Sequence, residues 1–407
     1  MEPQVRTIVE DEVPAWCAAL NLGFLKAAGA ADAEARRPGL YLDRTWAGYD
    51  GQDIVSTLRS FPVEVTVPGG ALLNASAVTA VTTTSTHRRQ GLAARMIAAD
   101  LAKSAEREDK LSVLIAAEWQ IYGQFGYGAA TEHQTWTVNA RVARLRRRPA
   151  GTVHYVDRDT ARAAMPEVYD RHRRMHPGEL SRDDRFHDIE FGLLRYPSWP
   201  EDKPGFQVLA RNPAGEVDGI ARYSYEEEWD YRQPAGQVSV QLLVASTAEA
   251  EALLWHHLIS LDLAATVKAP DRSTDELLPW LLADARHAQP SERSDFLWIR
   301  ALDVPAMLES RTYPVAGELV LEVIDPAGYA TGRFVVQAAP EGASCRPTTV
   351  TPDLIMGVSA FSSIYLGAHT VRTLAAAGLI EQVSSGAVAT ADDLLRSDVT
   401  PWCSTWF

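Results

Sequence analysis

The sequence has 407 residues, of which 46% are apolar and 23% charged, and this composition suits a folded protein of roughly two to four domains. Asp and Glu number 53 against 39 Lys and Arg, so the formal net charge is -14. A surface this acidic disfavours nucleic acid and anionic lipid as partners and favours cationic ligands, although acidity also serves solubility in many proteins.

The first 150 residues alternate between helical and strand patterns. Between Glu10 and Ala30 the apolar residues recur at helical spacing. Downstream, apolar periodicity and β-branched runs predict strands at 53–61, 63–67 and 72–84, a helix at 91–103, a strand at 111–116, a short helix at 119–123 and a strand at 131–138. This order predicts an α/β domain over residues 1–150.

A run of five arginines within residues 141–148, followed by Pro149-Ala-Gly, marks the first predicted boundary. Such a run is more typical of a solvated face or linker than of a contact patch. The second segment, 151–297, repeats the order of the first, with a helix at 161–176, strands at 205–210, 219–225 and 238–244, and a helix at 248–259. Its strand-to-helix junction holds neither glycine nor arginine, so this copy would lack the means to bind a pyrophosphate.

The third segment, 298–407, is predicted to contain strands at 318–324 and 333–337 and a helix at 361–379. The chain ends in an aromatic, uncharged stretch from Trp402 to Phe407. Chain ends are commonly polar and frayed, so this end is predicted to be docked, with a carboxylate as its last group.

The cysteines and the N-terminus indicate the cellular compartment in which the protein is expected. Cys17, Cys345 and Cys403 lie far apart, and none forms a CxxC pair. Neither a disulfide framework nor a metal site is therefore predicted, and a reducing compartment suits these residues. The N-terminus shows no basic stretch before an apolar run, and no window reaches about 18 uninterrupted apolar residues. We therefore expect a cytoplasmic protein that has neither a signal peptide nor a membrane span.

The segment Arg88-Arg89-Gln90-Gly91-Leu92-Ala93 follows a predicted strand and opens a predicted helix. First-turn amides of a helix have no partner within the helix, and the helix dipole adds positive charge there. A glycine allows close approach of the backbone and guanidiniums add fork-shaped donors, so the segment suits a pyrophosphate. The alternative is a junction with two solvent-facing arginines. Neither the G-x-G-x-x-G of a dinucleotide loop nor a Walker A loop is present.

A strand, this loop, an amphipathic helix and a further strand–helix unit resemble the coenzyme A site of the GNAT N-acetyltransferases. More specifically, Thr86-His-Arg-Arg-Gln-Gly91 and Ile121-Tyr-Gly-Gln-Phe-Gly-Tyr-Gly128 resemble hallmarks of the Eis family, which comprises aminoglycoside N-acetyltransferases of actinobacteria. The segments Ile364–His369 and Thr373–Ala377 and the terminal Phe407 extend the resemblance over essentially the whole chain.

The resemblance implies an α/β (α+β) chain in three parts. These are an active GNAT domain over 1–150, a GNAT-like domain without a cofactor loop over 151–297, and a domain similar to sterol carrier protein over 298–407. It also implies acetyl-CoA as the co-substrate, no metal, and a homohexamer built from two trimers.

Carried over by motif, the resemblance places cofactor contacts at Val81, Thr82, Thr83, Arg88, Arg89, Gln90, Gly91, Leu92, Ala93, Ala94, Ala117 and Glu118. The family often has Ser where this chain has Ala117, so a hydroxyl contact there is in doubt. The resemblance makes Tyr122 the general acid and the carboxylate of Phe407 the general base. Proton transfer from a phenol of pKa about 10 to the thiolate of a thiol of pKa about 8.5 is unfavourable by about 2 kcal/mol. The alternatives are a packed aromatic at Tyr122 and a terminus that docks only for stability.

Together these features predict an acetyl-CoA-dependent N-acetyltransferase that acts on primary amines of polycationic acceptors such as aminoglycosides. A protein or peptide lysine N-acetyltransferase is an alternative within the same class. A lipid-binding protein with a vestigial acetyltransferase half is a second alternative, although the intact loop at 88–93 and Tyr122 argue against it.

Overall fold

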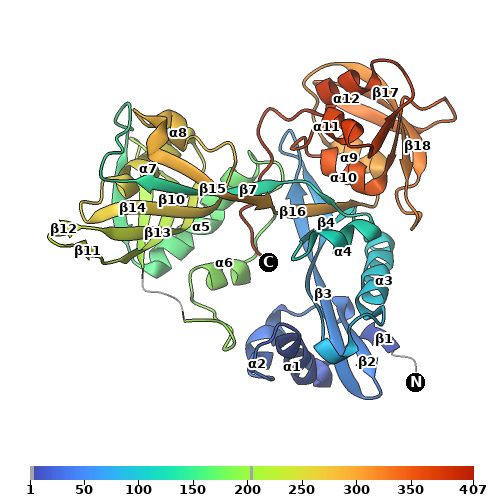
Figure 1. Ribbon diagram of the computed structural model, residues 1–407, viewed down its shortest axis with the longest axis horizontal. Helices are drawn as coiled ribbons and strands as arrows, with labels where there is room; N and C mark the ends of the chain where they lie inside the picture. The colour runs from blue at the N-terminus through green and yellow to red at the C-terminus, as the bar shows by residue number, and fades with distance from the viewer. Residues whose placement is uncertain (1–3, 202–204) are drawn as a thin grey trace.

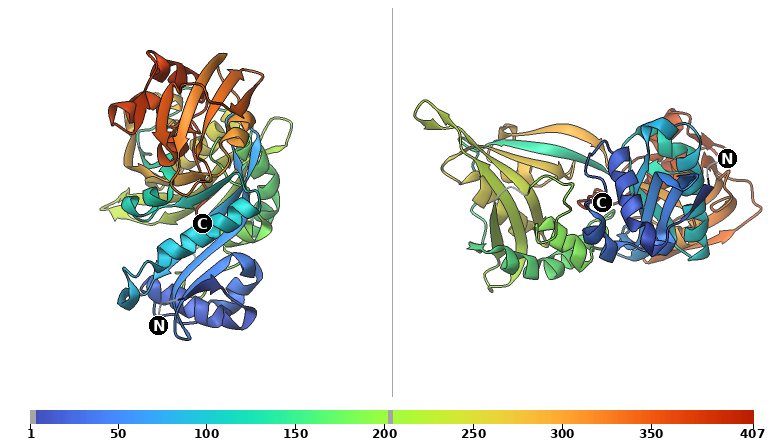
Figure 2. Two further views of the ribbon diagram at one scale, coloured as in Figure 1. Left: turned by 90° about the vertical axis from the view of Figure 1, so that its right-hand side faces the viewer. Right: turned by 90° about the horizontal axis from the view of Figure 1, so that it is seen from below.

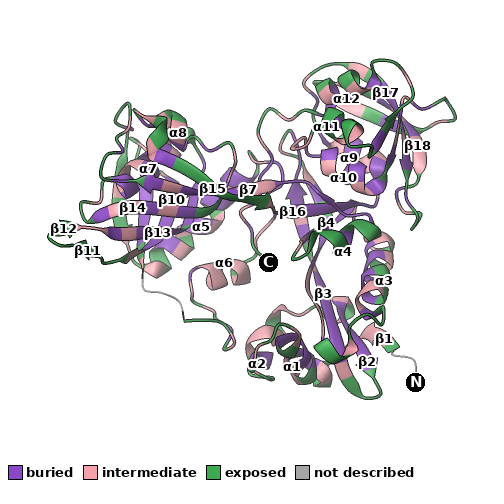
Figure 3. Cartoon of the chain, viewed as in Figure 1, coloured by how far each residue is buried: buried purple, intermediate pink, exposed green. Residues whose placement is uncertain are grey.

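The computed structural model describes residues 4–201 and 205–407, and within them two seven-stranded sheets and one five-stranded sheet organise the chain. Figure 1 shows the second sheet forming one lobe, at the left, while the first sheet and the C-terminal part stack on each other at the right. Figure 3 shows buried residues concentrated along the strands, with exposed ones on the projecting β11–β12 hairpin (Trp229–Asp230 and Gln233–Pro234). No helix within the described ranges is long and apolar enough to cross a membrane.

The first sheet carries helices on both faces. Trp46 and Ala47 are neighbours in one strand and belong to different core clusters, one with helix α3 and one with helix α1. Because successive side chains of a strand point to opposite faces, the two helices cover opposite sides of the sheet. The elements of this part are β1 (Gln4–Thr7), α1 (Val13–Gly23), α2 (Ala33–Arg36), β2 (Thr45–Asp50), β3 (Asp53–Thr66), β4 (Leu72–Thr83), α3 (Leu92–Glu106), β5 (Leu111–Ile115), α4 (Trp119–Tyr122) and β6 (Gly128–Ala129).

The predicted elements of this part are largely confirmed, with two differences. The helix expected between Glu10 and Ala30 is α-helical only over Val13–Gly23. The strands expected at 53–61 and 63–67 form one continuous strand, β3. Pro62 lies within this strand, opposite Ser76 of β4.

The second sheet has the same sandwich arrangement. Leu209 clusters with α5, whereas its neighbours Val208 and Ala210 cluster with α7, so these two helices also cover opposite faces. Its elements, in chain order, are β7 (Glu132–Asn139), β8 (Thr152–Val156), α5 (Arg158–Arg173), α6 (Asp184–Glu190), β9 (Phe206–Arg211), β10 (Val217–Glu226), β13 (Gly236–Ala245), α7 (Ala248–Ile259), β14 (Ala264–Arg272), α8 (Leu278–Leu281) and β15 (Ala288–Asp295).

The two large sheets exchange strands across both predicted domain boundaries. Strand β7 lies within the predicted first domain, 1–150, yet it pairs with β14 and β15 of the second sheet. Strand β16 (Leu297–Ala301) opens the predicted third domain, 298–407, yet it lies between β5 and β6 of the first sheet. The boundaries at 150 and 297 therefore describe chain order but not spatial units. Strand pairing between distant segments has no local signature, which is why the sequence pattern missed the exchange.

The arginine run is a linker that hydrogen bonds hold against the second lobe. Arg147 makes two hydrogen bonds to Glu249, at 2.8 and 2.5 Å, and Arg146 donates to the carbonyl of Trp280 at 3.2 Å. Leu145, the residue before Arg146, forms a β-bridge with Leu282. The run thus lies along the second lobe, as a linker held by its own side chains.

The C-terminal part is a five-stranded sheet with four helices among the described residues, namely α9 (Val304–Ser310), β17 (Gly317–Ile324), β18 (Gly332–Ala339), β19 (Gly342–Pro347), β20 (Leu354–Gly357), α10 (Val358–Ile364), α11 (Val371–Ala376), β21 (Ile380–Gln382) and α12 (Ala387–Leu395). The single helix predicted at 361–379 is wrong. Gly367 has φ +91°, outside helical geometry, and an added Cβ there would lie 2.7 Å from the carbonyl oxygen of Leu395. This tight turn splits the segment into α10 and α11.

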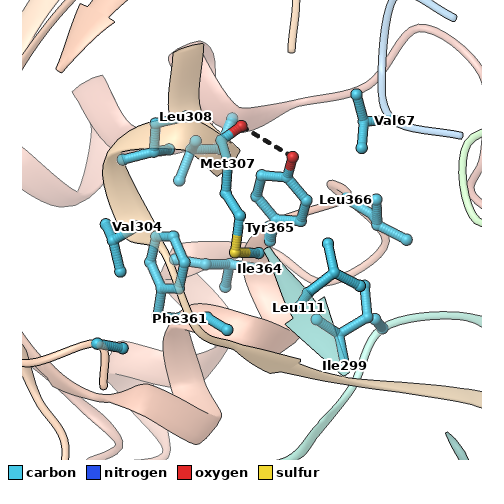
Figure 4. Packing of buried hydrophobic residues seen from close by; sticks show 14 of the residues in the cluster. Val67, Leu111, Ile299, Val304, Met307, Leu308, Phe361, Ile364, Tyr365 and Leu366 are labelled. Carbon is cyan, nitrogen blue, oxygen red and sulfur yellow. Dashed lines mark hydrogen bonds between the residues drawn. The ribbon is translucent and has the colours of Figure 1, made fainter. Parts of the chain in front are cut away.

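The C-terminal part and the first sheet share one core. Figure 4 shows Leu111 of β5 and Ile299 of β16 facing Met307 and Phe361, and the Tyr365 hydroxyl donating to the carbonyl of Met307 at 2.8 Å. The two parts are therefore held together by an apolar interior and are not merely tethered.

A buried ion pair crosses the same contact. Both guanidinium–carboxylate hydrogen bonds between Arg300 and Asp325 measure 2.8 Å, and neither side chain is more than 1% exposed. The Asp325 carboxylate also accepts the backbone N–H groups of Ala327 and Ala330. Both oxygens of the Asp325 carboxylate thus accept hydrogen bonds within the protein.

Asp325→Ala is expected to lower the free energy of unfolding by about 3–5 kcal/mol, because it leaves the Arg300 guanidinium buried and unpaired. Urea unfolding followed by tryptophan fluorescence measures the loss. Glu322→Ala is the matched control, since its ion pair with Arg333 is about one-third exposed and its removal should cost less than about 1 kcal/mol. Equal losses in the two variants would contradict the assignment.

Candidate active site

The end of β4 carries a bulge. Its register against β3 shifts between Thr57 and Arg59, and Ala80 lies in the left-handed region with φ +58°. The Thr57 hydroxyl holds this conformation by donating to the carbonyl of Ala80 at 2.8 Å. A bulge re-aims the residues that follow it, here Val81 onward. The sequence gives no sign of it, because alanine has no preference for positive φ.

Strands β4 and β5 separate as they approach the site. Their parallel pairing covers only Ala75–Ala77 against Leu111–Val113, although β4 runs on to Thr83 and β5 to Ile115. The backbone of β4 beyond Ala77 therefore lacks β5 as a partner. Such an opening offers main-chain groups to an extended ligand that lies between the strands.

The loop between β4 and α3 places open amides at this opening. Gly91 is the N-cap of α3, with φ +76° and ψ 6°, and Arg89 also has positive φ. The N–H of Arg95 donates to the Gly91 carbonyl at 3.0 Å, whereas the N–H groups of 88–94 donate to no described residue. These amides, together with the helix dipole, form a surface suited to phosphate oxygens.

Charge from both strand ends meets beside this loop. Arg88 lies 3.9 Å from Glu118, and both side chains are about two-thirds exposed. Ala117 and Glu118 lie two and three residues beyond the end of β5, so this contact joins the two sides of the opening. An exposed pair at this distance is weak, and the Arg88 guanidinium remains able to bind a phosphate.

Three of the predicted cofactor residues use their side chains for packing. The Thr83 hydroxyl lies 2.7 Å from that of Ser56, and the Thr82 side chain lies against Gly23, where an added Cβ would be 2.2 Å from its hydroxyl oxygen. Leu92 is buried in the core. Leu92 can therefore contact a ligand through its backbone, and the side chains of Thr82 and Thr83 are already engaged in part. The side chains of Gln90, Ala93 and Ala94 are at least partly accessible.

Gly91→Val is expected to raise the dissociation constant for coenzyme A at least tenfold. No atom lies within 4 Å of the position that a Cβ would take, so the side chain would enter the space proposed for phosphate, and a β-branched residue is strained at φ +76°. Isothermal titration calorimetry measures the affinity. Gly215→Val is the matched control, because Gly215 also has positive φ and open surroundings, in a turn of the second lobe. Unchanged affinity in Gly91→Val would remove this loop from the site.

Tyr122 lies at the end of α4, beside the opening. It clusters with Val78 and Leu114, the first residues of β4 and β5 beyond their paired segment. Its side chain is buried, and its hydroxyl makes no hydrogen bond to a described residue. The nearby Tyr127 differs, since its hydroxyl is bound to that of Ser112 at 2.7 Å in the core. Tyr122 thus keeps a hydroxyl available for a ligand, and Tyr127 serves packing.

Burial, and then the charge of Glu118, raise the pKa of Tyr122 to about 12. The phenol is therefore protonated at neutral pH, as a general acid must be. Full proton transfer to a thiolate of pKa about 8.5 is then uphill by about 5 kcal/mol, instead of about 2. If Tyr122 is the acid, a hydrogen bond from the phenol to sulfur as the carbon–sulfur bond breaks would stabilise the developing charge without complete transfer.

The turn after Tyr122 is held from outside the motif. The Arg300 guanidinium donates to the carbonyl of Phe125 at 2.6 Å, and the Ser359 hydroxyl donates to that of Gly123 at 3.1 Å. Both residues are more than 170 positions away in the chain, so no local pattern could have revealed them.

The C-terminal tail reaches the same sheet from the other face. The ring of Phe407 meets that of Phe61 edge-on, with centroids 5.7 Å apart. Phe61 pairs with Ala77, which in turn pairs with Val113, so this contact lies level with the point where β4 and β5 part. Figures 1 and 2 place the C-terminus between the two large lobes. The predicted docking of the aromatic terminus is confirmed, since Trp402 and Cys403 are fully buried.

Comparisons with known proteins agree with this architecture. Profiles of the acetyltransferase (GNAT) domain match residues 4–130 and 178–301, and the sterol carrier protein domain matches 304–404. An uncharacterised N-acetyltransferase of Streptomyces avermitilis is 41% identical over 99% of this chain and 98% of its own. The N-acetyltransferase Eis of Mycobacterium tuberculosis is 33% identical over 89% of this chain and 87% of its own. The crystal structure of Eis1 from Mycobacterium abscessus aligns with TM-score 0.88 and 28% identity, covering 99% and 100% of the two chains.

The chain belongs to the Eis family. It is an N-acetyltransferase with two GNAT domains and a C-terminal sterol carrier protein domain, and the GNAT fold implies the use of acetyl-CoA. The predicted family and fold class are thereby confirmed.

The second GNAT domain of this Eis-family chain differs from the first where a cofactor would bind. At the start of α7 the Thr247 hydroxyl accepts the N–H of Ala250 at 3.1 Å, so the helix is capped by its own side chain. At the start of α3, by contrast, Gly91 provides no side-chain cap. The open amides thus occur at the first helix and are partly satisfied at the second.

Proposed function

We propose that this member of the Eis family transfers the acetyl group of acetyl-CoA to primary amines of polycationic acceptors such as aminoglycosides. The observation that carries the proposal is the strand opening bordered by the unpaired amides of residues 88–94. The pyrophosphate would lie on those amides and on Arg88 and Arg89, with Gln90 at the loop surface. The pantetheine arm would follow the backbone of Val81 to Thr83 and pass Ala117 and Glu118.

In the proposed mechanism the amine nitrogen attacks the thioester carbonyl, the carbon–sulfur bond breaks, and Tyr122 donates its hydroxyl proton toward the departing sulfur. The Phe407 carboxylate accepts the proton that the amine loses. A terminal carboxyl of pKa about 3.5 is a weak base in water, and desolvation strengthens it. It takes the proton during or after attack by the nitrogen, when the pKa of that nitrogen has fallen.

The acceptor class rests on charge and on the family. The net charge of -14 favours cationic acceptors, because a negative surface concentrates them near the protein. We also propose a cytoplasmic homohexamer made of two trimers, as the resemblance implies. Light scattering of the purified protein tests the hexamer, and a monomer would contradict it.

A thiol-release assay with acetyl-CoA tests the proposed acceptor against kanamycin, neomycin and a lysine peptide. We expect turnover with the aminoglycosides to exceed that with the peptide by at least tenfold in kcat/KM. A preference for the peptide would favour the lysine N-acetyltransferase alternative. Absence of turnover with every amine, no calorimetric heat with coenzyme A and a copurifying lipid would favour the lipid-binding alternative.

A further inference from the structure

The last residues of the chain are held by the second GNAT domain. The backbone N–H of Trp402 donates to the carbonyl of Pro177 at 2.8 Å, and its indole N–H donates to that of Asp271 at 3.1 Å. The Arg272 guanidinium lies over the indole, 5.0 Å from the ring centre. This anchor fixes where the tail enters the space between the lobes.

Two buried charges grip the next residues of the tail. The Ser404 hydroxyl donates to Glu179 at 2.5 Å and accepts from Arg182 at 2.8 Å, and Arg182 also donates to the Thr405 hydroxyl at 3.0 Å. The side chains of Glu179 and Arg182 are both fully buried. Side chains of this kind are rarely buried without a structural or functional reason.

Glu179 and Arg182 both have partners outside the tail. Arg182 forms an ion pair with Glu190 at 2.9 Å and stacks on the ring of Tyr169, 3.9 Å from its centre. The Tyr169 hydroxyl lies 3.0 Å from the Glu179 carboxylate and 2.7 Å from the carbonyl of Leu180, within hydrogen-bond distance of both. Burial opposes the charge of Glu179, yet the His172 imidazole, whose Nε2 lies 3.4 Å from its carboxylate, and the charge of Arg182 hold its pKa at about 2. The two charges are therefore preorganised for the hydroxyls of the tail.

We propose that Glu179 and Arg182 are positioning residues that fix Ser404 and Thr405 and thereby aim the terminal carboxylate at the opening between β4 and β5. The inference rests on the proposed base role of that carboxylate. Thr405 is two residues from the chain end, which limits the reach of the carboxylate to about 7 Å from this fixed point. Holding a reacting group in place converts its encounter with substrate into an intramolecular step, and small misplacements can cost on the order of 10²-fold in rate.

This assignment gives the second GNAT domain a part in the reaction. The domain lacks an open cofactor loop, but the segment between α5 and α6 carries both gripping charges. The proposed acid then comes from the first domain, the proposed base from the last residue, and the orientation of the base from the second domain.

The double variant Ser404→Ala/Thr405→Val tests the inference, because it removes the two tail hydroxyls, including the contact of Thr405 with Tyr169, and leaves the Arg182–Glu190 ion pair and the Tyr169–Glu179 hydrogen bond in place. We expect kcat to fall about ten- to hundredfold with the KM for acetyl-CoA unchanged, and the thermal midpoint to fall by no more than a few degrees, because both charges keep partners outside the tail. Thr400→Val is the matched control, since its hydroxyl binds Asp275 at the surface, upstream of the Trp402 anchor. Wild-type kcat in the double variant would overturn the proposal.

A double-mutant cycle separates positioning from a general effect on the fold. The same two substitutions are introduced into a chain extended by two glycines after Phe407, in which the carboxylate is displaced. If they act through the carboxylate, they should lower kcat no further in that background. An equal further loss there would overturn the positioning role and leave the base role intact. An extended chain with wild-type kcat would refute the base role itself and, with it, this inference.

Discussion

Appending two glycines after Phe407 is expected to lower kcat by about 10²–10⁴-fold while coenzyme A affinity and the thermal midpoint stay at wild-type values. The extension keeps the ring of Phe407 against Phe61 but moves the carboxylate by up to about 7 Å. A general base must lie within hydrogen-bond reach of the proton that it accepts, so the displaced group would no longer act. Steady-state thiol release measures kcat, and calorimetry measures the affinity.

Phe407→Leu provides the matched comparison, because it removes the aromatic contact and retains a carboxylate at position 407. We expect it to lose less than about tenfold in kcat, since orientation of the tail would still be fixed at Thr405. Full activity of the extended chain would refute the proposed base. A larger loss in Phe407→Leu than in the extended chain would assign the effect to the ring.

Tyr122→Phe is the second substitution with a large expected effect, a fall in kcat of about 10²–10⁴-fold with coenzyme A affinity retained. The change removes one hydroxyl that has no hydrogen bond to a described residue, so the fold should be unaffected. Since burial and Glu118 raise the pKa of Tyr122 to about 12, the phenol carries its proton below that pH and would lose it only above it. The wild-type kcat should therefore show no alkaline decline from this group below about pH 11.

Tyr127→Phe separates loss of a hydroxyl from loss of catalysis. The Tyr127 hydroxyl is bound to that of Ser112 in the core, so its removal should cost about 1 kcal/mol of stability and little turnover. Parallel measurements of kcat and of urea unfolding for the two variants distinguish these outcomes. Near wild-type kcat in Tyr122→Phe would remove the acid assignment.

Features that depend on neighbouring residues could be predicted from the sequence. The helix after Gly91, the short helix that ends at Tyr122 and the docked terminus follow from local spacing and composition, and the structure confirms these elements. The break at Gly367 was missed because the Ala- and Leu-rich residues around it favour a helix. There a backbone contact with a distant segment outweighs local propensity.

Features that join distant segments could not be predicted. Arg300 binds the carbonyl of Phe125, and Glu179 and Arg182 bind the tail. These hydrogen bonds join residues between about 175 and 225 positions apart. Each of these residues looks like an ordinary surface charge in the sequence. The raised pKa of Tyr122 likewise arises from burial, which depends on the assembled core.

The exchange of β7 and β16 has a consequence for biosynthesis. During translation, the edge of β5 that faces away from β4 awaits a partner strand that is supplied only when residues 297–301 leave the ribosome. The nascent N-terminal lobe therefore presents an open sheet edge until about three-quarters of the polypeptide has been made, and such edges invite aggregation. We expect a fragment that stops at residue 150 to be insoluble, whereas one that continues to residue 301 completes both large sheets.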